Sequence, residues 1–309
     1  MIASLLRALF LWLGERRWMA RVALGTPLLR RMPLRFVAGT SLDDAVAAVR
    51  ALNAAGMSAT LDVLGESVSD RAAADRAAEG YVRTIERIAV DGLDANVSLK
   101  LSQMGLGLGV EACLDVLRPV IEAAANHRIF IRIDMEGSAT TDATLEIVER
   151  LRAAGRDVGR VIQAYLRRSA ADVARLAAVG ARTRICKGAY AEPASIAFDE
   201  RAEIDRSFVA LSTTLLVADA YPGIATHDPR MIEAVIRYVE EHNVAHDRFE
   251  FQMLYGVRRD LQRQLVERGY RVRVYTPYGT EWYPYFMRRL AERPANVLFV
   301  LRSLLGERR

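Results

Sequence analysis

The feature that most limits the fold of this chain is an alternation of two kinds of segment, which begins near residue 55 and repeats eight times. Short apolar, β-branched or alternating runs, typical of strands, are separated by Ala, Leu, Glu and Arg-rich segments with helical spacing. The runs read, in order, MSATLDVL, NVSLKLS, IFIRIDME, VIQAYL, TRICKGAY, GIATHD, FEFQML and RVRVYTP. Strand and helix alternating eight times predict an α/β fold whose parallel sheet closes into a (β/α)8 barrel.

An open doubly wound sheet is the alternative architecture. It would favour a Gly-rich phosphate loop directly after the first strand, with the spacing GxGxxG. The only comparable stretch, GLGLGV from Gly105 to Val110, has a different spacing and follows the second run. The closed barrel is therefore the favoured architecture.

The chain has 309 residues and contains no Gly, Pro or Ser-rich linker, which favours one large domain. We expect a barrel over residues 55–309, an N-terminal helical arm over residues 1–54, and a final helix over the C-terminal face of the barrel. The apolar run at the N-terminus contains Arg7 and has no small-residue cleavage pattern, which argues against a signal peptide. Because the run extends only to Leu13, it is also too short to span a bilayer. Two interpretations stay open: an arm packed on the domain, or an interfacial helix with Trp12 and Trp18 at a membrane surface.

The charge pattern bears on possible partners. The net charge of +5 and a pI near 9.4 raise the possibility of nucleic-acid binding. The cations, however, alternate with carboxylates and form no stripe interleaved with aromatic residues, which favours a solvated surface and no nucleic acid. The two cysteines, Cys113 and Cys186, have no CxxC spacing and indicate a reducing, cytoplasmic compartment. No metal-ligand cluster is visible.

Polar residues recur at or near the ends of the strand-like runs. In a (β/α)8 barrel the active site lies at the carboxyl ends of the strands, so these side chains are expected to meet at one rim. We expect Gln163 and Gln252 inside their strands and Tyr275 at the end of the last one. The complete set is Asp62, Lys100, Asp134, Glu136, Gln163, Arg184, Lys187, Thr226, His227, Gln252 and Tyr275.

The run TRICKGAY places cations on the fifth strand. If Arg184 and Cys186 face the barrel interior, Ile185 faces the helix layer. A buried Arg184 then needs an anion or a polar partner, because an unpaired buried charge costs several kcal/mol or more. Asp134 or an anionic cofactor could supply it. Gly188, directly after Lys187, would allow a ligand to approach the backbone closely.

A second cationic pair follows the eighth strand. Pro284 suits the first turn of a helix and Pro294 marks its end, which predicts a helix at the rim. Paired arginines such as Arg288 and Arg289 grip a carboxylate or phosphate group. The alternative is that both simply face solvent.

Nine segments in this order resemble the FAD-dependent proline dehydrogenase family, and most of all its short, single-domain bacterial members. The resemblance covers the chain from about residue 35 to its end. It implies a (β/α)8 barrel that binds FAD noncovalently and oxidises L-proline to 1-pyrroline-5-carboxylate, the first step of proline catabolism. The hydride passes from C5 of proline to N5 of the flavin, and electrons then reach a membrane quinone. The segments are LDVLGES, SLKLSQMG, RIDMEGS, QAYLRRS, RICKGAYAEP, IATHDPRMI, EFQMLYGVR, YTPYG and WYPYFMRRLAERPAN.

The resemblance also implies roles for individual residues. Asp134 and Arg184 match catalytic positions, while Lys100, Arg288 and Arg289 would hold the proline carboxylate. Tyr275 and Leu254 would pack on the proline ring. The flavin contacts would be Met135, Gln163, Arg184, Lys187, Gly188, Ala189, Thr226 and His227. Three departures from the family pattern affect the flavin pocket: Cys186, where an aliphatic residue is commoner, Ala191, where a bulky one often occurs, and Asp228, where Asn is frequent.

Other functions and partners remain open at this point. A Schiff-base lyase or aldolase on the same barrel could use Lys100 or Lys187 as its amine. A nucleic-acid or membrane-binding module would rest on the positive charge alone. Peripheral contact with the inner face of the cell membrane and a homo-oligomeric state are also compatible with the sequence.

Overall fold

Eight parallel strands form a closed barrel in the order β1-β2-β3-β4-β5-β6-β7-β8. This computed structural model describes residue 12 and residues 35–65, 67–218 and 220–292, with side chains through Met287. Adjacent strands pair in chain order, and β8 closes the ring on β1, with Thr60 opposite Tyr275. The strands are Ser58–Val63 (β1), Ala95–Leu99 (β2), Ile131–Ile133 (β3), Val158–Gln163 (β4), Thr183–Cys186 (β5), Gly223–Ala225 (β6), Glu250–Leu254 (β7) and Val272–Tyr278 (β8). The predicted (β/α)8 barrel is confirmed.

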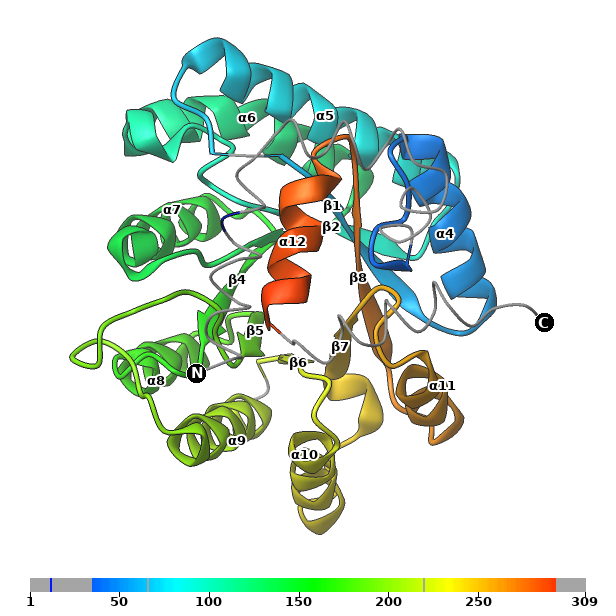
Figure 1. Cartoon of the computed structure of the whole chain (residues 1–309), viewed down its shortest axis with the longest axis vertical. Helices are drawn as coiled ribbons and strands as arrows, with labels where there is room; N and C mark the ends of the chain where they lie inside the picture. The colour runs from blue at the N-terminus through cyan, green and yellow to red at the C-terminus, as the bar shows by residue number, and fades with distance from the viewer. Residues whose placement is uncertain (1–11, 13–34, 66, 219, 293–309) are drawn as a thin grey trace.

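Helices connect the strands and surround the barrel (Figure 1). The connecting α-helices are Arg71–Val90 (α5), Val110–His127 (α6), Thr141–Ala153 (α7), Ser169–Ala178 (α8), Arg201–Val217 (α9), Pro229–Glu241 (α10) and Arg259–Glu267 (α11). Short 3₁₀ helices lie at Leu106–Leu108 (η2), Ser138–Thr140 (η3) and His246–Arg248 (η4). Because every crossover carries a helix, both faces of the sheet are covered or enclosed, as parallel sheets require.

Side chains alternate along the strands and so divide the core into two layers. Leu61 and Leu99 pack with Ile85 of α5 and Leu117 of α6 in the outer layer. Residues at the intervening positions face the barrel interior, where the Ser98 hydroxyl donates to Asp134. Each buried leucine side chain stabilises the fold by about 1.5–3 kcal/mol. Because of this alternation, polar side chains point into the barrel interior while apolar side chains pack against the helices.

The helix before the first strand, Leu42–Ala54 (α4), belongs to the outer ring of helices. Ser41 caps it: its hydroxyl accepts from the Asp44 N–H, and the Asp44 carboxylate accepts from the Ser41 N–H. Ala45 and Val49 are fully buried in the same core cluster as β1. The helix α4 therefore occupies the gap beside β8 that a connecting helix cannot fill. The division after residue 54 stays a prediction, and its residues 1–34, apart from a half-exposed helical Trp12, lie outside the described residues.

A final helix, Trp282–Glu292 (α12), follows β8 and lies across the opening of the barrel (Figure 1). Its aromatic side chains are buried, with Phe286 6 % exposed and its ring 6.1 Å from that of Phe36. The expected final helix over this end of the barrel is confirmed. Since the helix begins four residues after β8 ends, it cannot reach the outer layer and covers the mouth instead.

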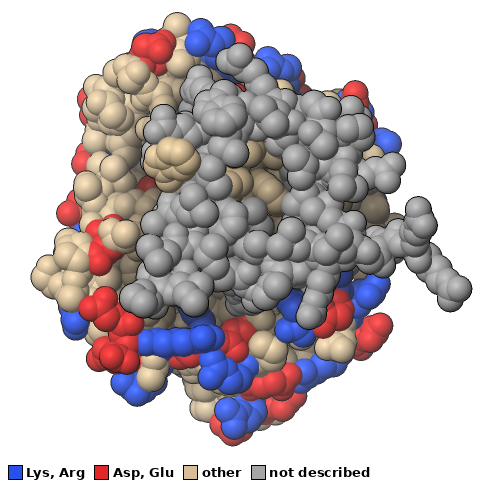
Figure 2. Space-filling view, viewed as in Figure 1, with Lys and Arg blue, Asp and Glu red and all other residues tan. Residues whose placement is uncertain are grey.

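On the face seen in Figure 2, cationic and anionic side chains lie interspersed around the edge rather than in a single-sign stripe. In the described ranges, no helix combines the length and apolar character needed to cross a membrane. Whether residues 1–34 form a packed arm or an interfacial helix falls outside the described residues and stays a prediction.

Candidate active site

Five side chains predicted for the rim meet inside the carboxyl end of the barrel: Asp62, Lys100, Asp134, Arg184 and Tyr275. We call them the central cluster. The Lys100 ammonium lies 2.9 and 3.0 Å from the two Asp62 carboxylate oxygens. The Tyr275 hydroxyl donates to Asp134 at 2.9 Å, and Lys100 Nζ lies 3.8 Å from the same carboxylate. Residues from strands on opposite sides of the ring are thus joined in one hydrogen-bonded group.

Arg184 is held on several sides. Its Nη1 donates to Asp134 at 2.7 Å and to the Ser98 hydroxyl at 3.3 Å, and its Nε donates to Gln252. The guanidinium also lies over the Tyr275 ring, 5.2 Å from the ring centre. The predicted burial of Arg184, its partner Asp134 and the outward orientation of Ile185 are confirmed. The fork of the guanidinium is fixed before any ligand arrives.

A hydrogen-bonded chain continues from Arg184 toward the amino end of the barrel. Gln252 Nε2 donates to Glu250 at 2.5 Å, and Arg273 Nε lies 2.9 Å from both Glu250 oxygens. The sequence reasoning identified Gln252 but missed Glu250. Both residues occupy interior positions two apart on β7, so the alternation in FEFQML was the available signal.

The charges of the central cluster are stabilised by their neighbours. Burial alone would raise the pKa of Asp134, but Arg184, Lys100 and hydrogen bonds from Ser98 and Tyr275 hold that pKa below its usual value. Burial works against the charge of Lys100, yet Asp62 and Asp134 raise its pKa. Burial and the two carboxylates raise the pKa of Tyr275 well above 10.0. At neutral pH the cluster therefore contains a carboxylate at Asp134, an ammonium and a neutral phenol.

These pKa directions predict how the cluster contributes to stability as pH changes. A carboxyl group with a lowered pKa in the folded state stabilises the fold above its unfolded pKa, near 3.8, and that contribution disappears as pH falls through the folded value. We therefore expect the difference in unfolding free energy between the wild type and Asp134→Asn to stay constant from about pH 5 to 8 and to narrow toward pH 3. Urea unfolding of both proteins across this range measures it. A difference that widens on acidification would contradict the charge state assigned to Asp134.

The residues matched to flavin contacts lie within or just after β3, β4, β5 and β6. Gln163 is the last residue of β4, not in the middle of the strand as expected. Its Nε2 donates to the Glu136 carbonyl at 2.8 Å, and its Oε1 accepts from the Ala189 N–H at 3.3 Å. Met135 is buried just after β3. Gln163 therefore links the loop after β3 to the loop after β5.

Tyr275 also differs from the expected placement, because β8 continues to Tyr278 and Tyr275 lies near its centre. The strand is longer than the sequence pattern indicated, since β1 pairs with it as far as Val63 opposite Tyr278. Tyr275 still reaches the rim cluster because its long side chain extends from the interior face toward Asp134.

Lys187 and His227 already have protein partners. Lys187 forms ion pairs with Asp205 and, at 3.1 Å, with Asp228. The His227 Nε2 accepts the Leu254 N–H at 2.8 Å, so this nitrogen is the unprotonated one. His227 thus holds the end of β7 in place and orients Leu254, which was predicted to pack on the substrate. Buried Thr226 accepts from the Asp228 N–H at 3.1 Å and shapes the start of α10.

Gly188 has a different neighbour from the one expected. It has φ of +119°, and a Cβ there would lie 2.2 Å from the Tyr165 ring. The room left by the missing side chain is thus filled by Tyr165 rather than kept for a ligand. The Tyr165 hydroxyl is buried and has no hydrogen-bond partner among the described residues, and burial raises its pKa to about 12.

The three departures from the family pattern have distinct consequences. Burial raises the pKa of Cys186 to about 12, so its side chain is a neutral thiol that replaces an aliphatic group without adding charge. Asp228 caps α10, and hydrogen bonds from Arg230 and Lys187 lower its pKa, so it is a carboxylate beside Lys187. Ala191 is exposed.

The predicted carboxylate grip of Arg288 and Arg289 lies on α12. The backbone of this helix is described to Glu292, but the two arginine side chains lie outside the described residues. Their role stays a prediction, as do the other assignments of individual residues to substrate or flavin.

Comparison with known proteins agrees with this geometry. The family model "Proline dehydrogenase" matches residues 45–302. The chain is 41% identical over 310 residues to a proline dehydrogenase of Deinococcus radiodurans, covering 99% of each chain. It is 40% identical over 303 residues to proline dehydrogenase 1 of Bacillus subtilis strain 168, covering 97% of this chain and 99% of the relative.

Among solved structures, proline utilization A from Bdellovibrio bacteriovorus inactivated by N-propargylglycine superposes with a TM-score of 0.81 and 26% identity. The match covers 91% of this chain and 34% of that longer chain. The family match extends from α4 to beyond α12 and includes every strand that supplies the central cluster. By fold, site geometry and sequence, the chain belongs to the proline dehydrogenase family.

Proposed function

We propose that this chain oxidises L-proline to 1-pyrroline-5-carboxylate with FAD as its cofactor. The observation that carries the proposal is the convergence of Arg184, Lys100 and Tyr275 on Asp134 at the carboxyl mouth of the barrel. This is the end at which (β/α)8 enzymes hold their substrates. Membership of the family supplies the reaction, and the cluster supplies fixed charges suited to a zwitterionic amino acid.

The described residues fit a flavin. An isoalloxazine ring presents carbonyl and ring-nitrogen groups that need hydrogen-bond partners. The ends of β4 and β6 offer neutral groups of that kind on Gln163 and Thr226, and Met135 offers an apolar surface. The Tyr165 hydroxyl, buried without a hydrogen-bond partner among the described residues, is a polar atom that bound FAD would be able to satisfy. Bound FAD would supply the two-electron acceptor for the bond broken at C5 of proline.

The chain's own residues then position the substrate. Lys100, with Arg288 and Arg289 from α12, binds the carboxylate of proline, and Tyr275 and Leu254 pack on the ring. Fixing the carboxylate orients C5 and converts a bimolecular encounter into a productive geometry. Arg184 keeps a positive charge near the flavin ring, where negative charge would develop on reduction. The helix α12, lying over the mouth, excludes water from this space.

The Schiff-base alternative is disfavoured by the carboxylates that surround Lys100 and Lys187. An amine nucleophile must lose its proton near neutral pH, which requires a lowered pKa. Carboxylates instead raise the pKa of Lys100, and Lys187 forms ion pairs with Asp205 and Asp228. The groups around Lys100 therefore hold it in its protonated form, and the Lys187 amine is engaged by two carboxylates.

An assay of turnover tests the proposal. Purified protein with bound FAD is expected to reduce an artificial electron acceptor when L-proline is added, with 1-pyrroline-5-carboxylate identified by mass. Acyclic secondary amines without a carboxylate serve as the control, since they lack the group that Lys100 binds. Equal turnover of such amines would contradict the assigned substrate.

The two arginines of α12 carry a separate prediction. Arg288→Ala and Arg289→Ala are each expected to raise KM for L-proline by roughly 10- to 100-fold, because each removes a charge-assisted hydrogen bond to the carboxylate. Steady-state kinetics measure this. Arg263 is an exposed residue of α11, so Arg263→Ala is the control and should leave KM unchanged. An unaltered KM in both α12 variants would remove them from the carboxylate site.

We propose further that the electrons pass to a membrane quinone, with the protein in the cytoplasm and in peripheral contact with the inner face of the membrane. The family resemblance supports this, and the cationic net charge of +5 suits an anionic lipid surface. Turnover with a soluble quinone analogue, with and without anionic vesicles, tests both points. Turnover that no quinone supports would exclude this acceptor. Size-exclusion chromatography would decide whether a homo-oligomer forms.

A further inference from the structure

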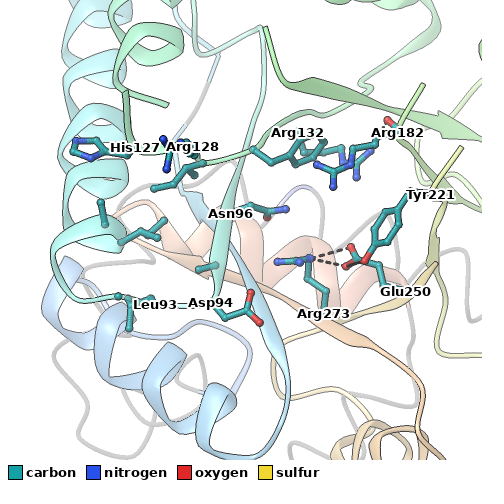
Figure 3. A pocket seen from close by; sticks show the side chains of 16 residues that line it. Leu93, Asp94, Asn96, His127, Arg128, Arg132, Arg182, Tyr221, Glu250 and Arg273 are labelled. Atoms are coloured by element: carbon teal, nitrogen blue, oxygen red, sulfur yellow. Dashed lines mark hydrogen bonds and ion pairs between the residues drawn. The ribbon is translucent and has the colours of Figure 1, made fainter. Parts of the chain in front are cut away.

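A cavity lies at the amino end of the barrel, opposite the central cluster. We call it the lower cavity. It has a volume of about 370 Å³ and is lined at the starts of several strands, with Arg132, Arg182, Arg273, Glu250 and Asn96 among its walls. Figure 3 shows the side chains of Arg132, Arg182 and Asn96 extending into the same space beside the Arg273–Glu250 pair. Nothing in the proposed reaction uses this space.

The charges of this cavity are not balanced. Glu250 is already occupied: it accepts from Arg273 at 2.9 Å on both oxygens, from Gln252 at 2.5 Å and from the Tyr221 hydroxyl at 3.3 Å. Its carboxylate therefore has little capacity left for a further cation. Arg132 makes no hydrogen bond to a carboxylate in the described part of the chain.

Arg132 is 2 % exposed and only partly bonded. Its Nη1 donates to the carbonyls of Arg160 and Arg182 at 3.0 and 2.9 Å, while its Nε is buried without a partner. Burial, together with repulsion from Arg184, lowers the pKa of Arg132 to about 9, and attraction from Glu250 offsets this only in part. A buried guanidinium is destabilising unless an anion accompanies it.

Arg182 is a second cation in the wall of the lower cavity. The guanidiniums of Arg132 and Arg182 are 4.7 and 4.9 Å from the centre of the same Phe130 ring. The exposed partner of Arg182, Asp157, is 3.4 Å away and two-thirds exposed, so that pair is weak. Both guanidiniums thus belong to the wall of the lower cavity, and that of Arg132 is buried without a hydrogen-bonded carboxylate among the described residues.

We propose that the lower cavity binds a small oxyanion, a phosphate or carboxylate group, between Arg132 and Arg182. Two forked guanidiniums match the paired oxygens of such groups. The ligand enters from the solvent-open amino end of the barrel, independently of the proline site at the other end. Its expected effect is to stabilise the fold by binding only the native state.

Ligand titration of the flavin-loaded protein tests this inference. Inorganic phosphate and acetate are added in separate series at constant ionic strength and pH, and the unfolding temperature and the heat of binding are recorded. A saturable rise of about 2–6 °C is expected with at least one of them. An effect of phosphate alone assigns the site to phosphate esters, and an effect of acetate alone assigns it to carboxylates. No saturable effect with either would overturn the proposal.

Variants locate the binding. The Arg182 side chain is half-exposed, so Arg182→Gln leaves the core intact. This variant is expected to weaken binding of the anion by roughly 10- to 100-fold, with turnover of proline unchanged. Arg132→Gln should remove it while keeping a donor for the two carbonyls. Arg156→Gln, on the exposed loop before β4, is the matched control and should bind as the wild type does. Equal affinity in Arg182→Gln and Arg156→Gln would place the anion elsewhere and overturn the assignment.

Discussion

Arg184→Met is expected to slow the reduction of bound flavin by proline by roughly 100- to 1000-fold while the protein remains folded. Arg184 is 6 % exposed at the carboxyl mouth, so its charge acts with little screening by solvent. Removing the cation should also make the flavin reduction potential more negative. Rapid-mixing absorbance for the rate, and a redox titration for the potential, measure the two effects.

Folding is expected to survive this substitution because Asp134 keeps other partners. Tyr275, Ser98 and Lys100 still contact its carboxylate. Arg160→Met is the matched control: Arg160 is equally buried on the neighbouring strand but pairs with Glu149 on the helix layer. Its loss should affect stability without changing the potential. Wild-type turnover with an unchanged potential in Arg184→Met would contradict the role given to this residue.

Lys100→Met is expected to cost both stability and catalysis. Asp62, whose side chain is 1 % exposed, would lose its ammonium partner, and breaking a buried ion pair costs about 3–5 kcal/mol. The same change removes a cation from the proposed carboxylate site, so kcat/KM for proline should fall by roughly 100-fold or more. Urea unfolding and steady-state kinetics measure the two losses.

The double variant Asp62→Asn with Lys100→Met separates these losses. Neutralising Asp62 removes the unpaired charge, so unfolding free energy should recover in a double-mutant cycle, while activity should not. Recovery of activity together with stability would mean that Lys100 only holds Asp62 and does not bind substrate.

Much of the fold was predictable because the spacing of apolar residues along the chain distinguishes strands from helices. Eight apolar, β-branched or alternating runs predicted β1 to β8, and Asp134 was one of two partners expected for a buried Arg184. The position of α4 beside β8 was not predicted, since an amphipathic helix does not encode which gap in a closing barrel it fills. Barrel closure between β8 and β1 decides that position.

The rest of the site depends on distances across the barrel, which sequence spacing does not contain. The pairing of Lys100 with Asp62 is set by the register of β1 against β2, where Leu61 lies opposite Val97. The Tyr165 ring that fills the space at Gly188 depends on the packing of two loops after neighbouring strands. Strand ends were also misjudged by a few residues, as at Gln163 and Tyr275.

Anaerobic addition of L-proline to the purified protein tests the central claim most directly. The protein is expected to be yellow, and its visible flavin absorbance is expected to bleach with L-proline and not with an equal concentration of D-proline, as 1-pyrroline-5-carboxylate appears. A colourless protein that binds no FAD, or one in which borohydride traps a carbonyl substrate on Lys100 or Lys187, would contradict the account.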